Sequence, residues 1–286
     1  MSFLIVILVL FVDRVLWHAD PYRQHSWFDR YLAALRRSPL GGVLGEHAWS
    51  AVLIIALPVA LIGWLQAGLM PVFGPLFEFA LGAVVLLLSL GPEELGRSVE
   101  DYQAATKAGD RQRASRLAGQ LSSDPASSVG EATGVVHGVL AAACQRLLGP
   151  LFWFVLFGAV GAAAYRLAQL LQQRQADSTA APTALTRGAH NLAYVLNWAP
   201  VRVTAAGYAV AGNFDAVAAA WKQCSQSEGE PDCPSDTSLL IATGEAALEQ
   251  SSPRSEAMLI EDSVALVWRN LTLWVLFLGS LTLFSL

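Results

Sequence analysis

Long apolar blocks are the feature that most restricts how this chain can fold. Segments 48–69, 72–90 and 264–285 contain few charges, and each is close to the roughly 20 residues that a helix needs to cross a bilayer. Segment 2–17 is apolar but shorter. Only 14% of the residues are charged, against about 25% in soluble domains. The sequence therefore predicts an all-α, polytopic integral membrane protein with four or five hydrophobic spans.

The fifth candidate span, residues 147–165, changes from aromatic to small residues along its length. The spacing of Gly158 and Gly161 would let a second helix approach closely, although ordinary helix packing is the favoured interpretation. In segment 48–69, Pro58 should kink the helix. Such a kink is tolerated in lipid when a neighbour satisfies the carbonyl that the proline leaves unbonded.

Arginine distribution predicts the orientation, because basic residues near membrane spans favour the cytoplasmic side. Segments 18–47 and 91–146 are rich in arginine, and the short turn at 68–71 has none. We therefore expect a multi-pass protein of the bacterial inner membrane with its N-terminus outside. The predicted parts are N-terminal membrane helices (1–90) with the basic cytoplasmic loop 18–47, a cytoplasmic helical region (91–146), and a C-terminal membrane region (147–286) with embedded segment 190–212 and polar loop 213–263.

Segment 190–212 leaves two topologies open, because Pro200 and Arg202 interrupt its apolar character. It either spans the bilayer or forms an embedded helical pair that does not cross. In the second case the following loop is periplasmic, and Cys224 and Cys233 could form a disulfide there. In the first case the loop is cytoplasmic and both thiols are reduced.

Motifs for the commonest enzyme chemistries are missing. The sequence has no GxxxxGK[ST] phosphate loop, no HExxH, no GxSxG and no EF-hand loop, which argues against the reactions those motifs support. Its cysteines lack zinc spacing. It has no long basic run, so a nucleic-acid partner is not expected. We predict no catalytic residue set, no metal and no cofactor.

Polar groups inside the apolar segments are the candidates for ligand binding, because ionisable residues are costly in lipid. Glu78 is such a residue, and Arg202 is its expected partner. His190, Tyr194 and Asn197 are spaced to share one helical face, which could line a cavity or bond to a neighbouring helix. The predicted ligand-binding residues are His190, Tyr194, Asn197, Trp198, Arg202 and Glu78.

Several strings resemble two related membrane families. The string NWAPVRVTAAGYAVAG at 197–212 is similar to a signature of both the CobD/CbiB synthases of cobalamin biosynthesis and the AmpE proteins linked to β-lactamase induction. PLFWFVLFG at 150–158, the following Tyr165-Arg166 pair and the Gly109-Asp110 turn fit both families. The resemblance covers most of the chain and is most specific over 90–220.

Two departures from the synthases decide the interpretation. The synthases carry an ENxxDG-like run where this chain has AACQRLLG (142–149), and an NTLDS-like run where it has QLLQQ (169–173). An amide-forming enzyme needs carboxylates for metal binding and general-base catalysis. The chain is therefore interpreted as resembling AmpE.

The AmpE resemblance implies a non-enzymatic signalling modulator of β-lactamase induction and cell-wall stress. Its partners would be the lipid bilayer and an unknown small ligand or regulatory protein. The alternative is an adenosylcobinamide-phosphate synthase-type amide-forming enzyme. Small-solute transport has weak support, because no pair of broken helices with midplane charges is evident.

Overall fold

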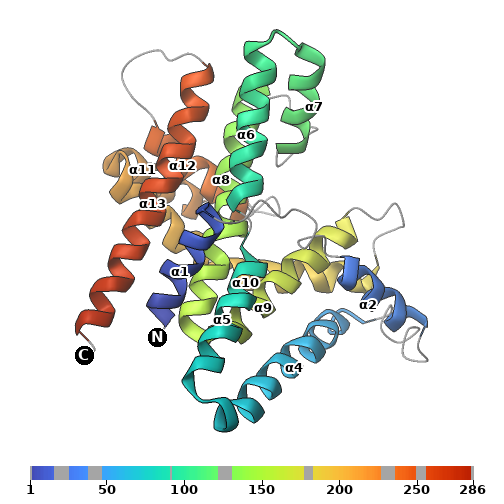
Figure 1. Ribbon diagram of the computed structural model, residues 1–286. Helices are drawn as coiled ribbons and strands as arrows, with labels where there is room; N and C mark the ends of the chain where they lie inside the picture. Colours follow the sequence, from blue (N-terminus) through green and yellow to red (C-terminus); the bar gives the residue numbers. More distant parts are fainter. Residues whose placement is uncertain are drawn as a thin grey trace. The chain divides into compact units, whose positions relative to one another are not determined.

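The computed structural model has only helices as regular elements in the residues that it describes (Figure 1). This confirms the predicted all-α class. The described residues are 2–15, 26–37, 47–90, 92–121, 131–176, 183–226, 236–248 and 256–284.

The helices follow one another along the chain with short connections. The bounds are α1 Ser2–Val15, α2 Ser26–Arg37, α4 Ser50–Phe73, α5 Pro75–Ser89, α6 Pro92–Lys107, α7 Arg111–Leu121, α8 Glu131–Ala143, a π-helical turn Cys144–Leu148, α9 Gly149–Ala176, α10 Ala184–Ala211, α11 Phe214–Gln226, α12 Asp236–Leu248 and α13 Glu256–Phe284.

Three helical stretches among the described residues are long and apolar enough to cross a membrane: Ser50–Leu69, Ala132–Ala176 and Ala257–Ser280. Leu76–Ser89 and Thr237–Leu248 are shorter apolar helices. Two predicted spans, 48–69 and 264–285, overlap the first and third of these stretches. The 14-residue α1 is shorter than a full span. The chain is therefore an all-α membrane protein with fewer full-length spans than predicted.

The chain divides into two compact units. Unit 1 combines residues 1–90 with 150–197, and unit 2 combines 91–149 with 198–286. One boundary falls inside α10, after Asn197. The units therefore do not follow the three consecutive parts expected from the sequence, since each unit draws on both halves of the chain.

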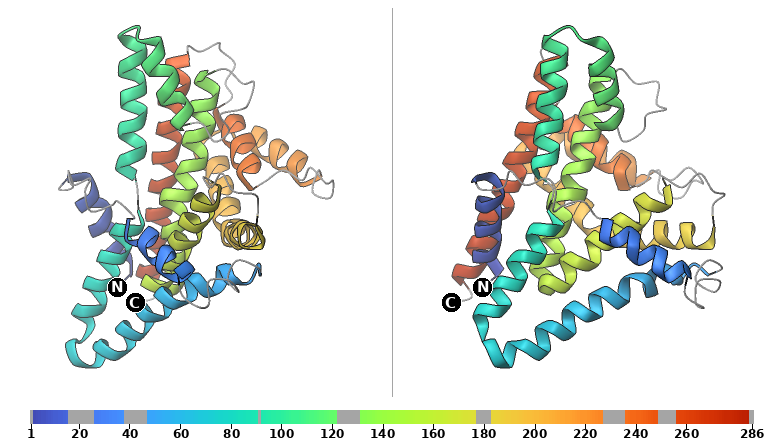
Figure 2. Two further views of the ribbon diagram at one scale, coloured as in Figure 1. Left: turned by 90° about the vertical axis from the view of Figure 1, so that its right-hand side faces the viewer. Right: turned by 45° about the vertical axis from the view of Figure 1, so that its right-hand side comes forward.

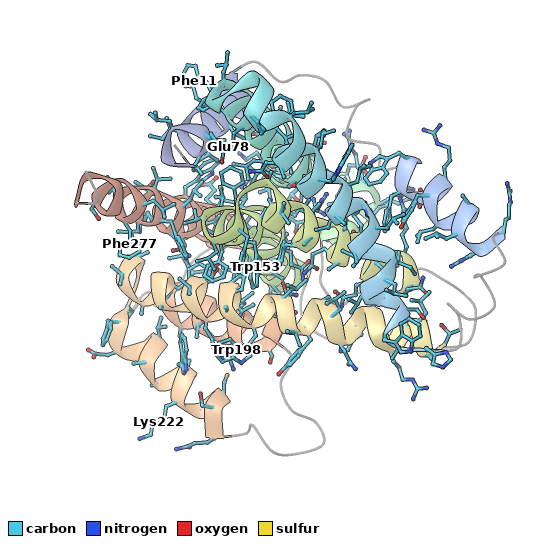
Figure 3. The ribbon with its side chains drawn as sticks, turned by 90° about the horizontal axis from the view of Figure 1, so that it is seen from below. Phe11, Glu78, Trp153, Trp198, Lys222 and Phe277 are labelled. Carbon is cyan, nitrogen blue, oxygen red and sulfur yellow. The ribbon has the colours of Figure 1, made fainter. Side chains whose placement is uncertain are left out.

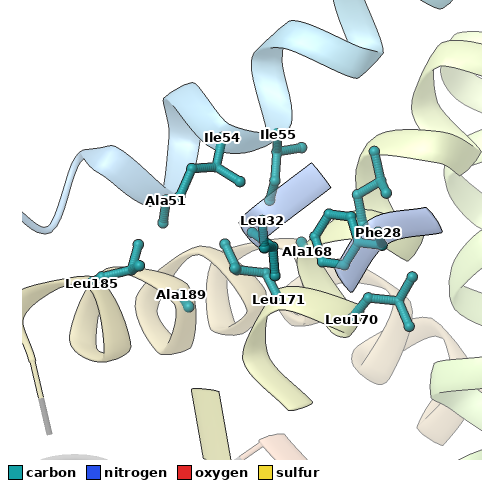
Figure 4. Close-up of a cluster of buried hydrophobic side chains, with 11 residues drawn as sticks. Phe28, Leu32, Ala51, Ile54, Ile55, Ala168, Leu170, Leu171, Leu185 and Ala189 are labelled. Carbon is teal, nitrogen blue, oxygen red and sulfur yellow. The ribbon is translucent and has the colours of Figure 1, made fainter. Parts of the chain in front are cut away.

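The core of unit 1 forms where α2 packs against the start of α4, the second half of α9 and the start of α10 (Figure 4). α2 is amphipathic, and its apolar residues are spaced three and four apart. The cluster consists of Phe28, Leu32, Ala51, Ile54, Ile55, Leu167, Ala168, Leu170, Leu171, Leu185 and Ala189. At its edge, the Arg174 Nε lies 2.9 Å from the Asp29 carboxylate. These contacts fix α2 on the ends of three other helices.

A hydrogen bond from α2 completes the backbone of α4. Pro58 lies inside α4 and has no N–H, so the carbonyl of Ile54, four residues earlier, loses its helical partner. The Tyr31 hydroxyl donates to this carbonyl oxygen at 2.8 Å. Burial raises the pKa of Tyr31 above its ordinary value, which keeps the phenol protonated as a donor. The neighbour expected for the freed carbonyl is therefore Tyr31.

Gly158 interrupts α9. Its φ of 63° and ψ of −148° are not helical, and such a positive φ strains any residue with a side chain. A Cβ on Gly161 would collide with the Trp153 carbonyl oxygen of the same segment. Gly161 is thus required by the chain's own bend. The predicted approach of a second helix at these glycines is not needed to explain them.

In unit 2, α6 and α7 form a helical hairpin (Figure 2). Gly109 adopts a φ of 73° at the turn, and the Asp110 carboxylate accepts a hydrogen bond from the Arg113 N–H at 3.0 Å. This is an N-cap of α7. α8 packs against α7, α12 and α13.

The stretch 213–263 is not the polar loop that the sequence suggested, because α11 and α12 lie within it and contact each other. Alanine, the strongest helix former, is frequent in both helices. Cys224 is half-buried near the end of α11, but Cys233 lies outside the described residues. The Cys224–Cys233 disulfide stays a prediction.

The bond between Tyr31 and Ile54 can be tested with a double-mutant cycle. Tyr31→Phe should lower the free energy of unfolding in detergent by about 1–3 kcal/mol, because it leaves a buried carbonyl unsatisfied. Pro58→Ala restores an N–H to Ile54, so Tyr31→Phe should cost much less in that background. Equal losses in both backgrounds, measured by denaturant unfolding, would show that the proline does not create the need for Tyr31.

Candidate functional site

A row of polar side chains lies between α9 and α10 in unit 1. Tyr165, Gln169 and Gln172 follow one another on α9 at spacings of four and three residues, which places them on one helical face. They bond to Asn197 and His190 of α10. These five residues are called the polar seam. They stand out because both helices are otherwise largely apolar here.

Asn197 is the centre of the seam. The Tyr165 hydroxyl donates to its Oδ1 at 2.7 Å, and the Gln169 Nε2 donates to the same atom at 2.9 Å. Tyr165 and Gln169 are 0% and 2% exposed, so these bonds are formed away from water, where leaving a donor unpaired is costly. Both bonds use the amide oxygen, and the NH₂ group of Asn197 takes no part in them.

The other end of the seam is exposed. The Gln172 Nε2 lies 3.5 Å from the His190 Nδ1, and His190 is exposed at its position on α10. Beyond it, the Thr186 hydroxyl donates to the Gln175 Oε1 at 3.4 Å. The seam therefore runs from a buried amide centre to a solvent-facing imidazole.

A tryptophan fixes α10 beside the seam. Pro200 lies inside α10, so the Leu196 carbonyl, four residues earlier, has no helical partner. The Trp153 indole Nε1 donates to this oxygen at 3.0 Å (Figure 3). Trp153 belongs to the PLFW string and Pro200 to the NWAP string. The two strings noted in the sequence are thus joined by a hydrogen bond that the proline requires.

Trp198 and Arg202 form a separate pair on α10, one turn apart and within unit 2. The Arg202 guanidinium lies 4.3 Å from the centre of the Trp198 ring, a cation–π arrangement, and its Nη1 donates to the Trp198 carbonyl at 3.3 Å. Trp198 is 51% exposed. The pair is a surface feature of α10 and is not part of the seam.

The structure brings together two of the predicted ligand-binding residues, His190 and Asn197, through the seam. Tyr194 is exposed on α10, and Glu78 lies half-buried in the first turn of α5. The pairing of Glu78 with Arg202 stays a prediction. The α9 side of the seam was missed. Its signal was present as polar residues at helical spacing in an apolar segment, but the QLLQQ run was interpreted only as lacking acids.

The seam is suited to hydrogen bonding. Its groups are amides, a phenol and an imidazole, which can hold a polar ligand through donors and acceptors. Among the described residues, no group of three or more His, Cys, Asp or Glu side chains could hold a metal ion.

Unit 2 has its own polar contacts. The His137 Nε2 lies 2.6 Å from the Glu245 carboxylate, joining α8 to α12. The Thr204 hydroxyl donates to the Cys144 sulfur at 3.6 Å, and the Asn270 Nδ2 donates to the Thr204 carbonyl at 3.2 Å. These bonds fasten α8, α10, α12 and α13. They account for His137 and Cys144 as packing residues.

Comparison with known proteins identifies relatives. A family model described as CobD/Cbib protein matches residues 6–247. A cobalamin biosynthesis protein CobD of Chromobacterium violaceum is 27% identical over 260 residues, covering 86% of this chain and 80% of the relative. A cobalamin biosynthesis protein CobD of Stutzerimonas stutzeri is 27% identical over 300 residues, covering 96% of each. No solved structure matches.

These matches correct the sequence interpretation. The assignment to AmpE is not supported, and a role as a modulator of β-lactamase induction is wrong, because the family and both relatives are of the CobD type. The error came from treating two missing acidic runs as the loss of the whole activity. The alternative named from the sequence, the cobalamin-synthase type, agrees with the matches.

The bonds at Asn197 predict different effects for two substitutions. Asn197→Ala should lower the free energy of unfolding by about 1–3 kcal/mol for each buried donor that it strands. Asn197→Asp keeps an oxygen that both donors can reach, so it should retain most of the stability. Thermal unfolding in detergent measures both. If the two variants were equally destabilised, the amide oxygen would not be the group that holds the seam.

Proposed function

The chain belongs to the CobD/Cbib family, and on that premise we propose that it is a membrane-bound enzyme of cobalamin biosynthesis. Its proposed reaction is amide formation of the adenosylcobinamide-phosphate synthase type. The observation that carries the proposal is the extent of the match, because the family model spans residues 6–247 and so includes the whole polar seam. Both CobD relatives also align over most of this chain.

The seam is the part of the described structure best suited to position a substrate. Amide formation joins an amine to a carboxyl group, and both groups are recognised by neutral donors and acceptors. Two buried bonds already hold the Asn197 side chain in one orientation. A group fixed in advance loses little freedom when a ligand binds, which favours binding and orientation. The seam therefore has a positioning role in this proposal.

The two departures from the synthases limit what the seam itself can do. In 169–173 the chain has glutamines where the synthases have an acidic run, and Gln169 and Gln172 both bond across the seam. In 142–149 it has a π-helical turn with buried Cys144, Leu147 and Leu148. Neither segment supplies a carboxylate. The proposed reaction therefore draws its acid–base groups from other parts of the chain.

We place the protein in the bacterial inner membrane as a multi-pass protein. Three long apolar helical stretches support more than one crossing. The concentration of arginine in 18–47 and 91–146 supports a cytoplasmic position for both segments. Whether α10 crosses the bilayer decides the side on which α11 and α12 lie.

Complementation tests the function. The chain should restore cobalamin-dependent growth to a bacterial strain that lacks its cobinamide-phosphate synthase. The measurement is growth on a medium that requires newly made cobalamin, with the membrane abundance of the protein followed in parallel. Normal abundance without growth would contradict the proposal.

A matched pair of variants then tests the seam. Asn197→Ala should reduce complementation at least about tenfold, since losing one positioning hydrogen bond commonly costs that much. Asn191→Ala changes the same residue type at an exposed position of the same helix, so it should leave growth unchanged. If both variants grow like the parent at equal abundance, the seam is structural only.

A further inference from the structure

We propose that α2 and the helix ends beside it bind anionic phospholipid headgroups at the bilayer surface. The proposed surface consists of Arg30, Arg36 and Arg37 of α2, Arg187 of α10, and the exposed tryptophans Trp27 and Trp49. It is called the basic collar. This inference concerns the attachment of unit 1 to the membrane and does not depend on the proposed reaction.

Two membrane-crossing stretches end where α2 packs. One candidate span begins at Ser50, and another ends at Ala176. The apolar face of α2 contacts the first turns of α4 through Ala51 and Ile54, and contacts the second half of α9 through Leu170 (Figure 4). α2 therefore lies at the level where hydrocarbon gives way to the headgroup layer, which is only a few ångströms thick on each side.

The outer face of α2 is basic. Arg30 and Arg37 are seven residues apart, so they lie on one side of the helix, and that side is opposite Phe28 in the core. Both arginines and Arg36 are exposed.

Acidic groups do not balance this charge nearby. In 26–37, 47–60, 166–176 and 183–190, the chain has six arginines and one acid, Asp29. Asp29 lies 2.9 Å from Arg174. The region therefore has a strong positive excess.

Exposed tryptophans mark the same surface. Trp27 is 47% exposed on α2, and Trp49 is 52% exposed just before α4. Tryptophan is enriched at membrane–water interfaces, where its ring is shielded and its N–H stays hydrated. The Trp49 ring lies 5.4 Å from that of His47.

Charge and aromatic residues together select the partner. Basic residues beside tryptophans at the headgroup level attract acidic lipids, and each cation near an anionic surface strengthens binding by about fivefold. A soluble acidic partner would account for the arginines but not for two exposed tryptophans at the end of a membrane span. Phosphatidylglycerol is the probe that matches this chemistry.

The experiment measures phosphatidylglycerol retained by the purified full-length protein, using native mass spectrometry and a titration of short-chain phosphatidylglycerol in detergent. Arg30→Gln, Arg36→Gln and Arg37→Gln combined should weaken binding at least tenfold. The matched control combines Lys107→Gln, Arg113→Gln and Arg116→Gln on the α6–α7 hairpin and should retain parental affinity. The triple Arg→Lys variant of α2 should also retain most of the binding, because charge is preserved.

Several outcomes would overturn the proposal. Equal losses in the α2 and hairpin variants would show that net charge alone attracts the lipid. Competition by inorganic phosphate at equal concentration would assign the collar to a soluble phosphate ligand. Equal retention of phosphatidylcholine would remove the charge selectivity. If the triple variant loses its folded state, Arg37→Gln alone should still weaken binding by about fivefold, and no change there would also contradict the proposal.

Discussion

A backbone carbonyl that loses its partner inside a membrane helix is the constraint on which much of unit 1 depends. Hydrocarbon offers no water to replace the missing bond, and an unsatisfied group there costs several kcal/mol. Pro58 and Pro200 each create such a carbonyl, at Ile54 and Leu196. Tyr31 and Trp153 satisfy them at 2.8 and 3.0 Å. In both places an aromatic side chain from another helix donates, so each proline determines a helix–helix contact.

The contact at Leu196 also explains the position of the polar seam. Asn197 is the next residue, and its side chain faces Tyr165 and Gln169 on the same α9 that carries Trp153. One bond to the backbone and two to the side chain therefore fix the register of α9 against α10. Leu196 and Asn197 belong to consecutive turns of contact, so a shift of either helix would break all three bonds together.

The sequence was sufficient for the fold class and for part of the site. Apolar blocks predicted membrane helices, and Pro58 predicted a carbonyl in need of a donor. The donor could not be predicted, because Tyr31 lies 23 residues away from Ile54 in a polar segment. Helical spacing grouped His190 with Asn197, but pairing of α9 with α10 is a tertiary contact that periodicity does not contain. Alanine-rich α11 and α12 were missed because their charged and polar flanks suggested a loop.

The functional error has a physical explanation. A glutamine has nearly the shape of a glutamate and keeps one acceptor oxygen, but it gains donors and loses the charge. The QLLQQ run therefore preserves hydrogen bonding between α9 and α10 while removing carboxylates, and its missing acids say little about whether a substrate is held there. The exposed end of the seam, His190, follows Ala189, which packs in the α2 cluster. The seam and the basic collar thus open at the same end of unit 1, where a polar substrate can approach from water and where the helix ends meet the bilayer surface.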